Sequence, residues 1–171
     1  MNRSPARPDA TPIAIAGFMG AGKSAVAFGA AAVTGRMALD LDRVIEHSAG
    51  RSIAQIWEAE GEAGFRRREL EALREQLVGS VVIALGGGAL TDDEAWDLVK
   101  AGSCSVWLDA PLDVLWQRAG KDPSRPLAQD RAAFEALFEH RRARYSECDH
   151  RLDATLPVVE LAEEVARLCD G

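Results

Sequence analysis

Cysteine is scarce in this 171-residue sequence, which contains only Cys104, Cys148 and Cys169. The three are scattered, odd in number and without the spacing of metal ligands. This usage is typical of a reducing compartment. We therefore expect three reduced thiols and a cytoplasmic location.

Positive charge and long apolar runs are scarce as well. The formal net charge of −7 argues against nucleic acid as a partner, because phosphate backbones select basic surfaces. No apolar run approaches the roughly 20 residues of a membrane-spanning helix, and the basic N-terminus lacks the apolar core of a secretory signal. We expect neither a nucleic acid nor a membrane as partner.

Lysine is the third scarcity, since Lys23, Lys100 and Lys121 are the only lysines among 20 basic residues. Arginine supplies the other basic residues, so an isolated arginine is weak grounds for a functional role.

The polar, proline-containing residues 1–11 are expected to form a disordered tail. With no repeat or linker, residues 12–171 are expected to form one domain, and with no apolar stripe the chain is expected to be a monomer.

Short apolar runs alternate with amphipathic stretches along the chain. The runs cover 13–16, 37–39, 81–85, 104–108 and, more weakly, 151–154. Helical patterns cover 23–33, 43–49, 52–58, 62–78, 92–100, 112–119, 130–147 and 158–168. This alternation predicts a three-layer α/β fold in which a parallel sheet of about five strands is flanked by helices. Ligands in such sheets bind beyond the carboxyl ends of the strands.

A phosphate-binding loop follows the first predicted strand. Residues 17–24 read Gly-Phe-Met-Gly-Ala-Gly-Lys-Ser and match the pattern G-x-x-x-x-G-K-[ST]. Glycines allow backbone N–H groups to approach phosphate oxygens, and the following helix adds its positive dipole end. Lys23 is expected to contact the β- and γ-phosphates of ATP and Ser24 to ligate Mg²⁺.

The acidic residue that usually completes a P-loop magnesium site is missing from its usual place. The apolar run 81–85 is followed by Gly86, Gly87 and Gly88 rather than by aspartate. Asp40 and Asp42 are the substitutes that we predict, because residues two apart in extended chain point to one face. Asp40 is assigned to Mg²⁺ and Asp42 to the acceptor hydroxyl. The alternative is that one of them caps the next helix.

The glycine triplet has its own interpretation. Three residues without side chains at a strand end allow a ligand to lie against the backbone N–H groups. A flexible turn is the alternative.

With these motifs assembled, the sequence resembles the shikimate kinase family from about residue 11 to residue 168. The matching segments, all in family order, are the loop 17–24, Asp40-Leu41-Asp42, Gly61-Glu62 with Phe65-Arg66, Gly86-Gly87-Gly88, Arg125-Pro126-Leu127 and Arg141 with Tyr145. The resemblance implies transfer of the γ-phosphoryl group of ATP to the 3-hydroxyl of shikimate, with Mg²⁺ as cofactor. It also implies an acceptor-binding segment at about 40–68 and a mobile lid at about 119–129.

The resemblance further implies a set of site residues. Lys23, Asp42 and Arg125 are the expected catalytic residues. The expected ATP contacts are Gly17, Gly20, Ala21, Gly22, Lys23, Ser24, Ala25, Arg118 beside the adenine, and Arg125. The expected acceptor contacts are Asp42, Arg66, Gly86, Gly87, Gly88 and Arg141, with Trp57 and Phe65 as an apolar wall. The alternative for these two aromatic residues is an ordinary place in the core. Two guanidiniums suit the carboxylate of shikimate, because each offers a planar fork of donors.

Some positions depart from the family pattern. Trp57 stands where phenylalanine is usual, and Ala25 where threonine is common. The segment before Tyr145 lacks the usual Pro-Leu, so Arg142 competes with Arg141 for the carboxylate role. Two rival functions remain open at this point: a related kinase for gluconate or a nucleoside monophosphate, and a regulatory ATP-binding module without an acceptor.

Overall fold

The computed structural model describes residues 10–121 and 130–169 of the chain. Residues 1–9 of the tail predicted at 1–11 and residues 122–129 of the lid predicted at about 119–129 lie outside the described residues. Arg125 is among the residues that are not described.

A parallel five-stranded sheet with the order β2-β3-β1-β4-β5 runs through the described residues. The strands are β1 (Ile13–Gly17), β2 (Met37–Asp40), β3 (Val81–Ala84), β4 (Cys104–Asp109) and β5 (His150–Asp153). Every residue of β1 and β3 is buried, whereas the edge strands β2 and β5 are partly exposed. The predicted fold class is confirmed, and the apolar runs 13–16, 81–85 and 104–108 coincide with the strands that are covered on both faces.

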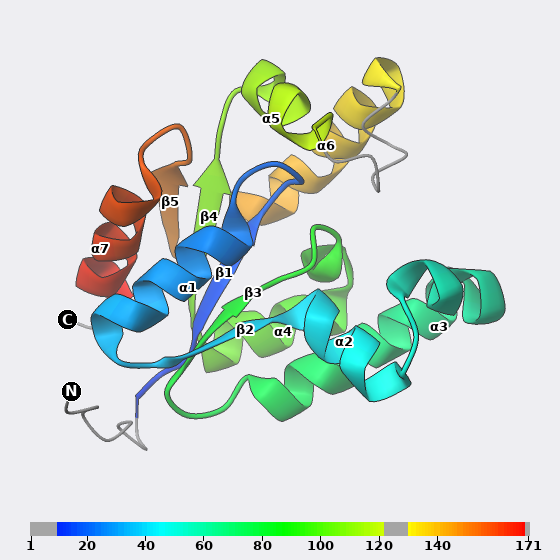
Figure 1. Cartoon of the computed structure of the whole chain (residues 1–171), viewed down its shortest axis with the longest axis horizontal. Helices are drawn as coiled ribbons and strands as arrows, with labels where there is room; N and C mark the ends of the chain where they lie inside the picture. Colours follow the sequence, from blue (N-terminus) through cyan, green and yellow to red (C-terminus); the bar gives the residue numbers. More distant parts are fainter. Residues whose placement is uncertain (1–9, 122–129, 170–171) are drawn as a thin grey trace.

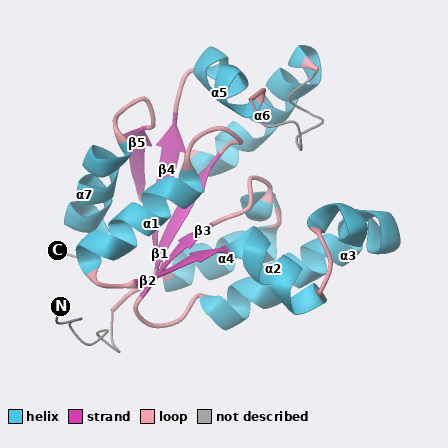
Figure 2. Cartoon of the chain, viewed as in Figure 1, coloured by secondary structure: helices cyan, strands magenta, loops and turns pink. Residues whose placement is uncertain are grey.

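Helices cover both faces of this sheet. They are α1 (Lys23–Thr34), α2 (Leu41–Ala49), α3 (Ile53–Gln76), the 3₁₀ turn η1 (Ala89–Thr91), α4 (Asp93–Gly102), α5 (Leu112–Ala119), α6 (Arg131–Tyr145) and α7 (Val158–Cys169). In Figure 1, α1 and α7 lie in front of the sheet and α4 lies behind it, while α2 and α3 extend to one side. Figure 2 shows the resulting three layers. Within the part of the chain that the structure describes, no helix combines the length and the apolar character needed to span a membrane.

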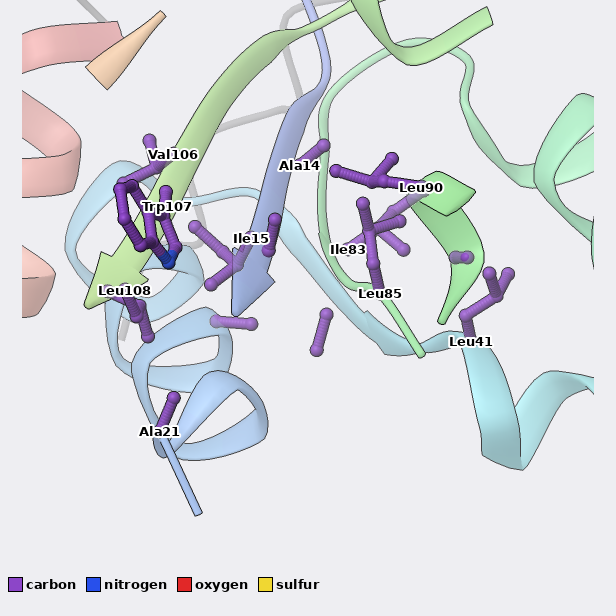
Figure 3. Packing of buried hydrophobic residues seen from close by; sticks show 14 of the residues in the cluster. Ala14, Ile15, Ala21, Leu41, Ile83, Leu85, Leu90, Val106, Trp107 and Leu108 are labelled. Atoms are coloured by element: carbon purple, nitrogen blue, oxygen red, sulfur yellow. The ribbon is translucent and has the colours of Figure 1, made fainter. Parts of the chain in front are cut away.

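The central strands carry the hydrophobic core (Figure 3). Ile15, Ile83 and Leu108 from three neighbouring strands are at most 1% exposed. Burying each such side chain contributes roughly 1.5–3 kcal/mol relative to leaving it in water. The core therefore fixes the carboxyl ends of β1 and β3, which the phosphate loop and the glycine triplet follow.

Glu60 connects the two halves of α3 across a kink at Gly61. Gly61 has φ 68°, a left-handed conformation that favours glycine, so the predicted helices 52–58 and 62–78 meet here at an angle. Glu60 accepts hydrogen bonds from Arg68 at 2.9 and 2.8 Å and from Arg51 at 2.7 Å. The hydrogen bond from Arg68 is the main cause that lowers the pKa of Glu60 to about 2. These contacts hold the bend that turns α3 toward the site.

The expectation of three reduced cysteines is wrong. Cys104 and Cys169 form a disulfide in the structure, with a sequence separation of 65 residues, and Cys148 is free. Spacing along the chain concealed this pair, because its members meet only after α7 has packed onto the sheet.

Candidate active site

The phosphate loop connects the end of β1 to the start of α1. Gly20 has φ 84°, and a Cβ on it would lie 2.6 Å from the carbonyl oxygen of Leu115. Only glycine fits there, because both the conformation and the space exclude a side chain. Gly22 precedes α1 without a side-chain cap, so the first N–H groups of α1 are left for an anion.

The first two residues of α1 carry the polar groups of this loop. Lys23 Nζ donates a hydrogen bond to the Phe18 carbonyl at 3.1 Å. Ser24 Oγ donates to Asp40 Oδ2 at 2.5 Å. The hydroxyl of the phosphate loop and the carboxylate at the end of β2 are therefore neighbours, as a shared metal site requires.

Asp40 also caps α2, so the capping alternative is confirmed, while its role at Mg²⁺ stays a prediction. Its Oδ1 accepts hydrogen bonds from the backbone N–H groups of Asp42 at 3.1 Å and Arg43 at 3.4 Å, which leaves Oδ2 for Ser24. The expected extended conformation holds for Asp40, the last residue of β2, but is wrong for Leu41 and Asp42. Because Asp40 nucleates the helix, α2 begins at Leu41 and Asp42 lies in its first turn. Asp42 nevertheless lines the same cavity as Asp40.

The glycine triplet forms a surface against which charged side chains pack. A Cβ on Gly86 would lie 2.7 Å from Glu69 Oε1 and 3.0 Å from Asp42 Oδ1. A Cβ on Gly88 would lie 2.5 Å from Arg66 Nη2 and 2.9 Å from Arg141 Nη2. None of the three glycines has a positive φ. The triplet is therefore needed for space rather than for a flexible turn.

Gly88→Ala is expected to lower kcat/KM for the acceptor by about 10- to 100-fold, because the new methyl group displaces two guanidiniums from their positions. Steady-state kinetics with varied acceptor at saturating ATP measure this. Gly102→Ala is the matched control, since its Cβ would meet only Leu77 at an ordinary 3.5 Å. Equal kinetics for the two variants would contradict the assigned role of the triplet.

A buried ion pair lies beside these glycines. Arg66 Nη1 donates to Glu69 Oε2 at 2.5 Å, and the Glu69 side chain is only 2% exposed. Glu69 Oε1 is buried and has no hydrogen-bond partner among the described residues. Burial raises the pKa of Glu69, although the charge and hydrogen bond of Arg66 oppose that shift. The carboxylate fixes the guanidinium of Arg66 toward the cavity.

The last turns of α6 supply a second guanidinium. Arg141 lines the cavity, and burial lowers its pKa from the usual arginine value. The Tyr145 hydroxyl donates to the Gly87 carbonyl, and burial raises the pKa of Tyr145 to about 12. Arg142 lies elsewhere, at a separate hollow that Asp109 and Arg151 line. The structure therefore brings Arg141, and not Arg142, together with Arg66.

Two aromatic rings border the acceptor side of the cavity. The ring centroids of Trp57 and Phe65 are 5.5 Å apart, and the Arg66 guanidinium lies 5.3 Å from the Phe65 centroid. Phe65 is buried, whereas Trp57 is 39% exposed. Both rings line the cavity, and their role as a wall for the acceptor stays a prediction.

One cavity of about 700 Å³ connects the phosphate loop, the two aspartates, the glycine triplet, Arg66 with Glu69, Arg141 and the two aromatic rings. Of the predicted nucleotide contacts, Gly20, Gly22, Lys23, Ser24, Ala25 and Arg118 line it, whereas Gly17 and the buried Ala21 do not. Arg118 donates a hydrogen bond to the Ala154 carbonyl at 2.8 Å, next to the loop after β5. Sequence analysis missed Glu69 and the Tyr145 hydroxyl as members of the site. The only local signal for Glu69 was its spacing of three residues from Arg66 on a helix.

Glu69→Gln is expected to gain stability relative to the unmodified chain as pH rises. Because the folded-state pKa of Glu69 is raised, this carboxyl adds to the free energy of unfolding of the unmodified chain below its ordinary pKa of 4.5. That contribution is lost as pH rises through the folded-state pKa. Glutamine does not titrate and lacks this loss. Urea unfolding of both chains across this pH range measures the difference, and parallel stability curves would contradict the shift.

The parallel sheet, the phosphate loop and the adjoining cavity with an acid and two guanidiniums define a P-loop kinase for small molecules. The family model for shikimate kinase matches residues 19–169. The shikimate kinase of Salinibacter ruber is 39% identical over 175 residues, covering 95% of this chain and 86% of that protein. The shikimate kinase of Synechococcus elongatus is also 39% identical, over 142 residues, covering 81% of this chain and 74% of that protein. The chain belongs to the shikimate kinase family.

Solved structures agree with this membership. A shikimate kinase from Acinetobacter baumannii in complex with shikimate is similar with a TM-score of 0.88 and 33% identity, covering 94% of this chain and 93% of that one. A gluconokinase from Sinorhizobium meliloti has a TM-score of 0.60 at 21% identity, a likeness of fold alone. The family resemblance predicted from the motifs is thereby confirmed.

Proposed function

We propose that this chain transfers the γ-phosphoryl group of ATP to the 3-hydroxyl of shikimate, giving shikimate 3-phosphate and ADP. The observation that carries the proposal is a single cavity with a phosphate loop at one end and Asp42, Arg66 and Arg141 at the other. Family membership supports the same acceptor.

The phosphate-loop end of the cavity neutralises the charge of the ATP phosphates. The backbone N–H groups of the phosphate loop and of the start of α1 bind phosphate oxygens, and Lys23 moves from the Phe18 carbonyl to the β- and γ-phosphates. Arg118 contacts the adenine side. Arg125, which lies outside the described residues, is proposed to close over the γ-phosphate and exclude water.

Mg²⁺ is the proposed cofactor. The Ser24 hydroxyl and the Asp40 carboxylate are hard oxygen donors 2.5 Å apart, which fits a cation that prefers oxygen ligands. Ser24 would bind the ion directly and Asp40 through water. When bound, Mg²⁺ neutralises charge on the β- and γ-phosphate oxygens.

The acceptor end holds an organic anion. Arg66 and Arg141 both lie within contact distance of a Cβ on Gly88, so one carboxylate can bridge them. Glu69 positions Arg66 through its ion pair. Trp57 and Phe65 cover the apolar face of the shikimate ring, and the backbone of residues 86–88 contacts the polar edge of that ring.

Asp42 orients the acceptor hydroxyl. Phosphoryl transfer passes through a loose transition state, so positioning and neutralisation dominate catalysis. The acceptor oxygen forms its bond to the γ-phosphorus as the bond to the bridging oxygen of ADP breaks. Asp42 accepts the hydroxyl proton late in this transfer.

A coupled ADP-release assay tests the proposal. The chain with Mg²⁺ and ATP is expected to turn over with shikimate at least about 100-fold faster than with gluconate, AMP or no acceptor. Of these, only shikimate combines a carboxylate for the paired guanidiniums with a rigid ring that the Trp57 and Phe65 wall can cover. Preference for gluconate or AMP would support a related kinase. ATP binding without turnover on any acceptor would support a regulatory module. The monomeric state and the cytoplasmic location stay predictions.

A further inference from the structure

Three metal-ligating side chains meet at the amino ends of β4 and β5, outside the active site. Cys104 begins β4, His150 begins β5 and Cys169 ends α7. One ligand atom from each lies within 4.8 Å of the others, and all three residues are half-buried. Cys104 and Cys169 are joined as a disulfide, with 5.8 Å between their Cα atoms.

The strand register explains this juxtaposition. His150 pairs with Val106, and Cys104 is two residues before Val106 on the same strand. Residues two apart on a strand share a face, and paired residues of neighbouring parallel strands do so too. Cys104 and His150 therefore point to one face, and α7 covers that face in front of β5 (Figure 1).

We propose that reduction of this disulfide opens a Cys104–His150–Cys169 site for Zn²⁺. Two thiolates and an imidazole are the donors that zinc prefers, and a water completes four-coordination. Tetrahedral bonds of about 2.3 Å place two sulfurs about 3.8 Å apart. The 5.8 Å between the Cα atoms of the two cysteines leaves that separation within reach of side-chain rotation.

The disulfide and dithiol forms of Cys104 and Cys169 interconvert by thiol–disulfide exchange. A dithiol gives two electrons and two protons to the Cys104–Cys169 bond and closes to its own disulfide, leaving two thiols on the chain. Zn²⁺ then displaces the two thiol protons to solvent as it binds the thiolates. The oxidised chain cannot bind the ion in this way, because both sulfurs are committed to each other.

The proposed zinc site and the phosphate loop lie at opposite ends of the strands. The Cys104 N–H donates to the Pro12 carbonyl at the start of β1, whereas the phosphate loop follows the other end of that strand at Gly17. The site instead ties the end of α7 to the sheet. Because α7 packs on α1, with Ala162 against Gly29, the bound ion would stabilise the layer that carries Lys23 and Ser24.

Cobalt(II) is the probe, since only cysteine ligation produces a thiolate-to-cobalt charge-transfer band. The full chain is reduced with dithiothreitol, desalted under nitrogen and titrated with Co²⁺ in excess Mg²⁺, with the oxidised chain in parallel. We expect one tetrahedral Co²⁺ per reduced chain, displaced by Zn²⁺, and no band in the oxidised chain. At Zn²⁺ about 100-fold above its Kd, the Tm of the reduced chain should rise by about 5 to 10 °C.

The variants isolate the ligands. Cys104→Ser and Cys169→Ser should each abolish the band, and His150→Ala should weaken Co²⁺ binding at least about tenfold. Cys148→Ser is the matched control and should behave as the unmodified chain, because Cys148 lies outside the cluster. A reduced chain without the band, or one that loses its circular dichroism on reduction, would overturn the proposal. So would an unchanged band in Cys104→Ser.

Discussion

Replacing Asp42 with asparagine is expected to lower kcat about a thousandfold, because a positioned carboxylate that orients the hydroxyl and accepts its proton contributes roughly 10²–10⁴ to such a step. Asp42 lies in the first turn of α2 and lines the cavity, and its Oδ1 faces Gly86, where a Cβ would lie 3.0 Å away. Asparagine keeps the size of the side chain but removes its charge. Steady-state kinetics with shikimate measure the loss.

The same variant should bind ATP within about threefold of the unmodified chain, because Asp42 is not among the groups placed on the phosphates. Equilibrium titration with a non-hydrolysable ATP analogue checks this. Asp97→Asn is the matched control, since Asp97 is an exposed acid on α4 away from the cavity lining. Near-normal turnover of Asp42→Asn would remove Asp42 from the mechanism.

Replacing Arg141 with alanine is expected to raise KM for shikimate at least about 30-fold, because losing one partner of a buried charged pair costs about 2–5 kcal/mol. Arg141 is half-buried, lines the cavity and lies with Arg66 over Gly88. KM for ATP should change little. Initial rates with each substrate varied at saturation of the other separate the two constants.

Arg142→Ala is the matched control for this experiment. Arg142 is the next residue on α6, but it stacks near Phe138 and lies 3.9 Å from Glu139, away from the cavity. The KM of this variant for shikimate should stay within about twofold of the unmodified value, as for most surface arginines outside a site. The opposite pattern, with Arg142→Ala alone impaired, would transfer the carboxylate role to Arg142.

Local patterns predicted most of the fold. Each apolar run became a strand, and a helix forms over most of every stretch with a helical pattern, although α3 ends at Gln76 rather than 78 and α6 at Tyr145 rather than 147. The weakest run, 151–154, is the edge strand β5, whose alternating burial lacks the continuous apolar signal of β1 or β3. The phosphate loop was equally readable, because its function depends on residue types at fixed spacing.

Contacts between distant segments were predicted less well. Residues 40–42 were expected in extended chain, but Asp40 caps α2 and thereby places Asp42 on a helix. Glu69 looked like an ordinary helical acid until packing buried it against Arg66 and the glycines. The choice between Arg141 and Arg142 was open in the sequence, because only the rotation of α6 against the sheet decides which side chain enters the cavity.

The order of residues alone determined the parallel sheet, the phosphate loop and the family, since hydrophobic periodicity and short motifs act over a few neighbouring residues. Tertiary structure decided that Asp42, Arg66 and Arg141 share one cavity, that Glu69 is buried there, and that Cys104 meets Cys169. Those contacts join residues far apart in the chain, and they form only when burial of the core brings the strand ends and helices together.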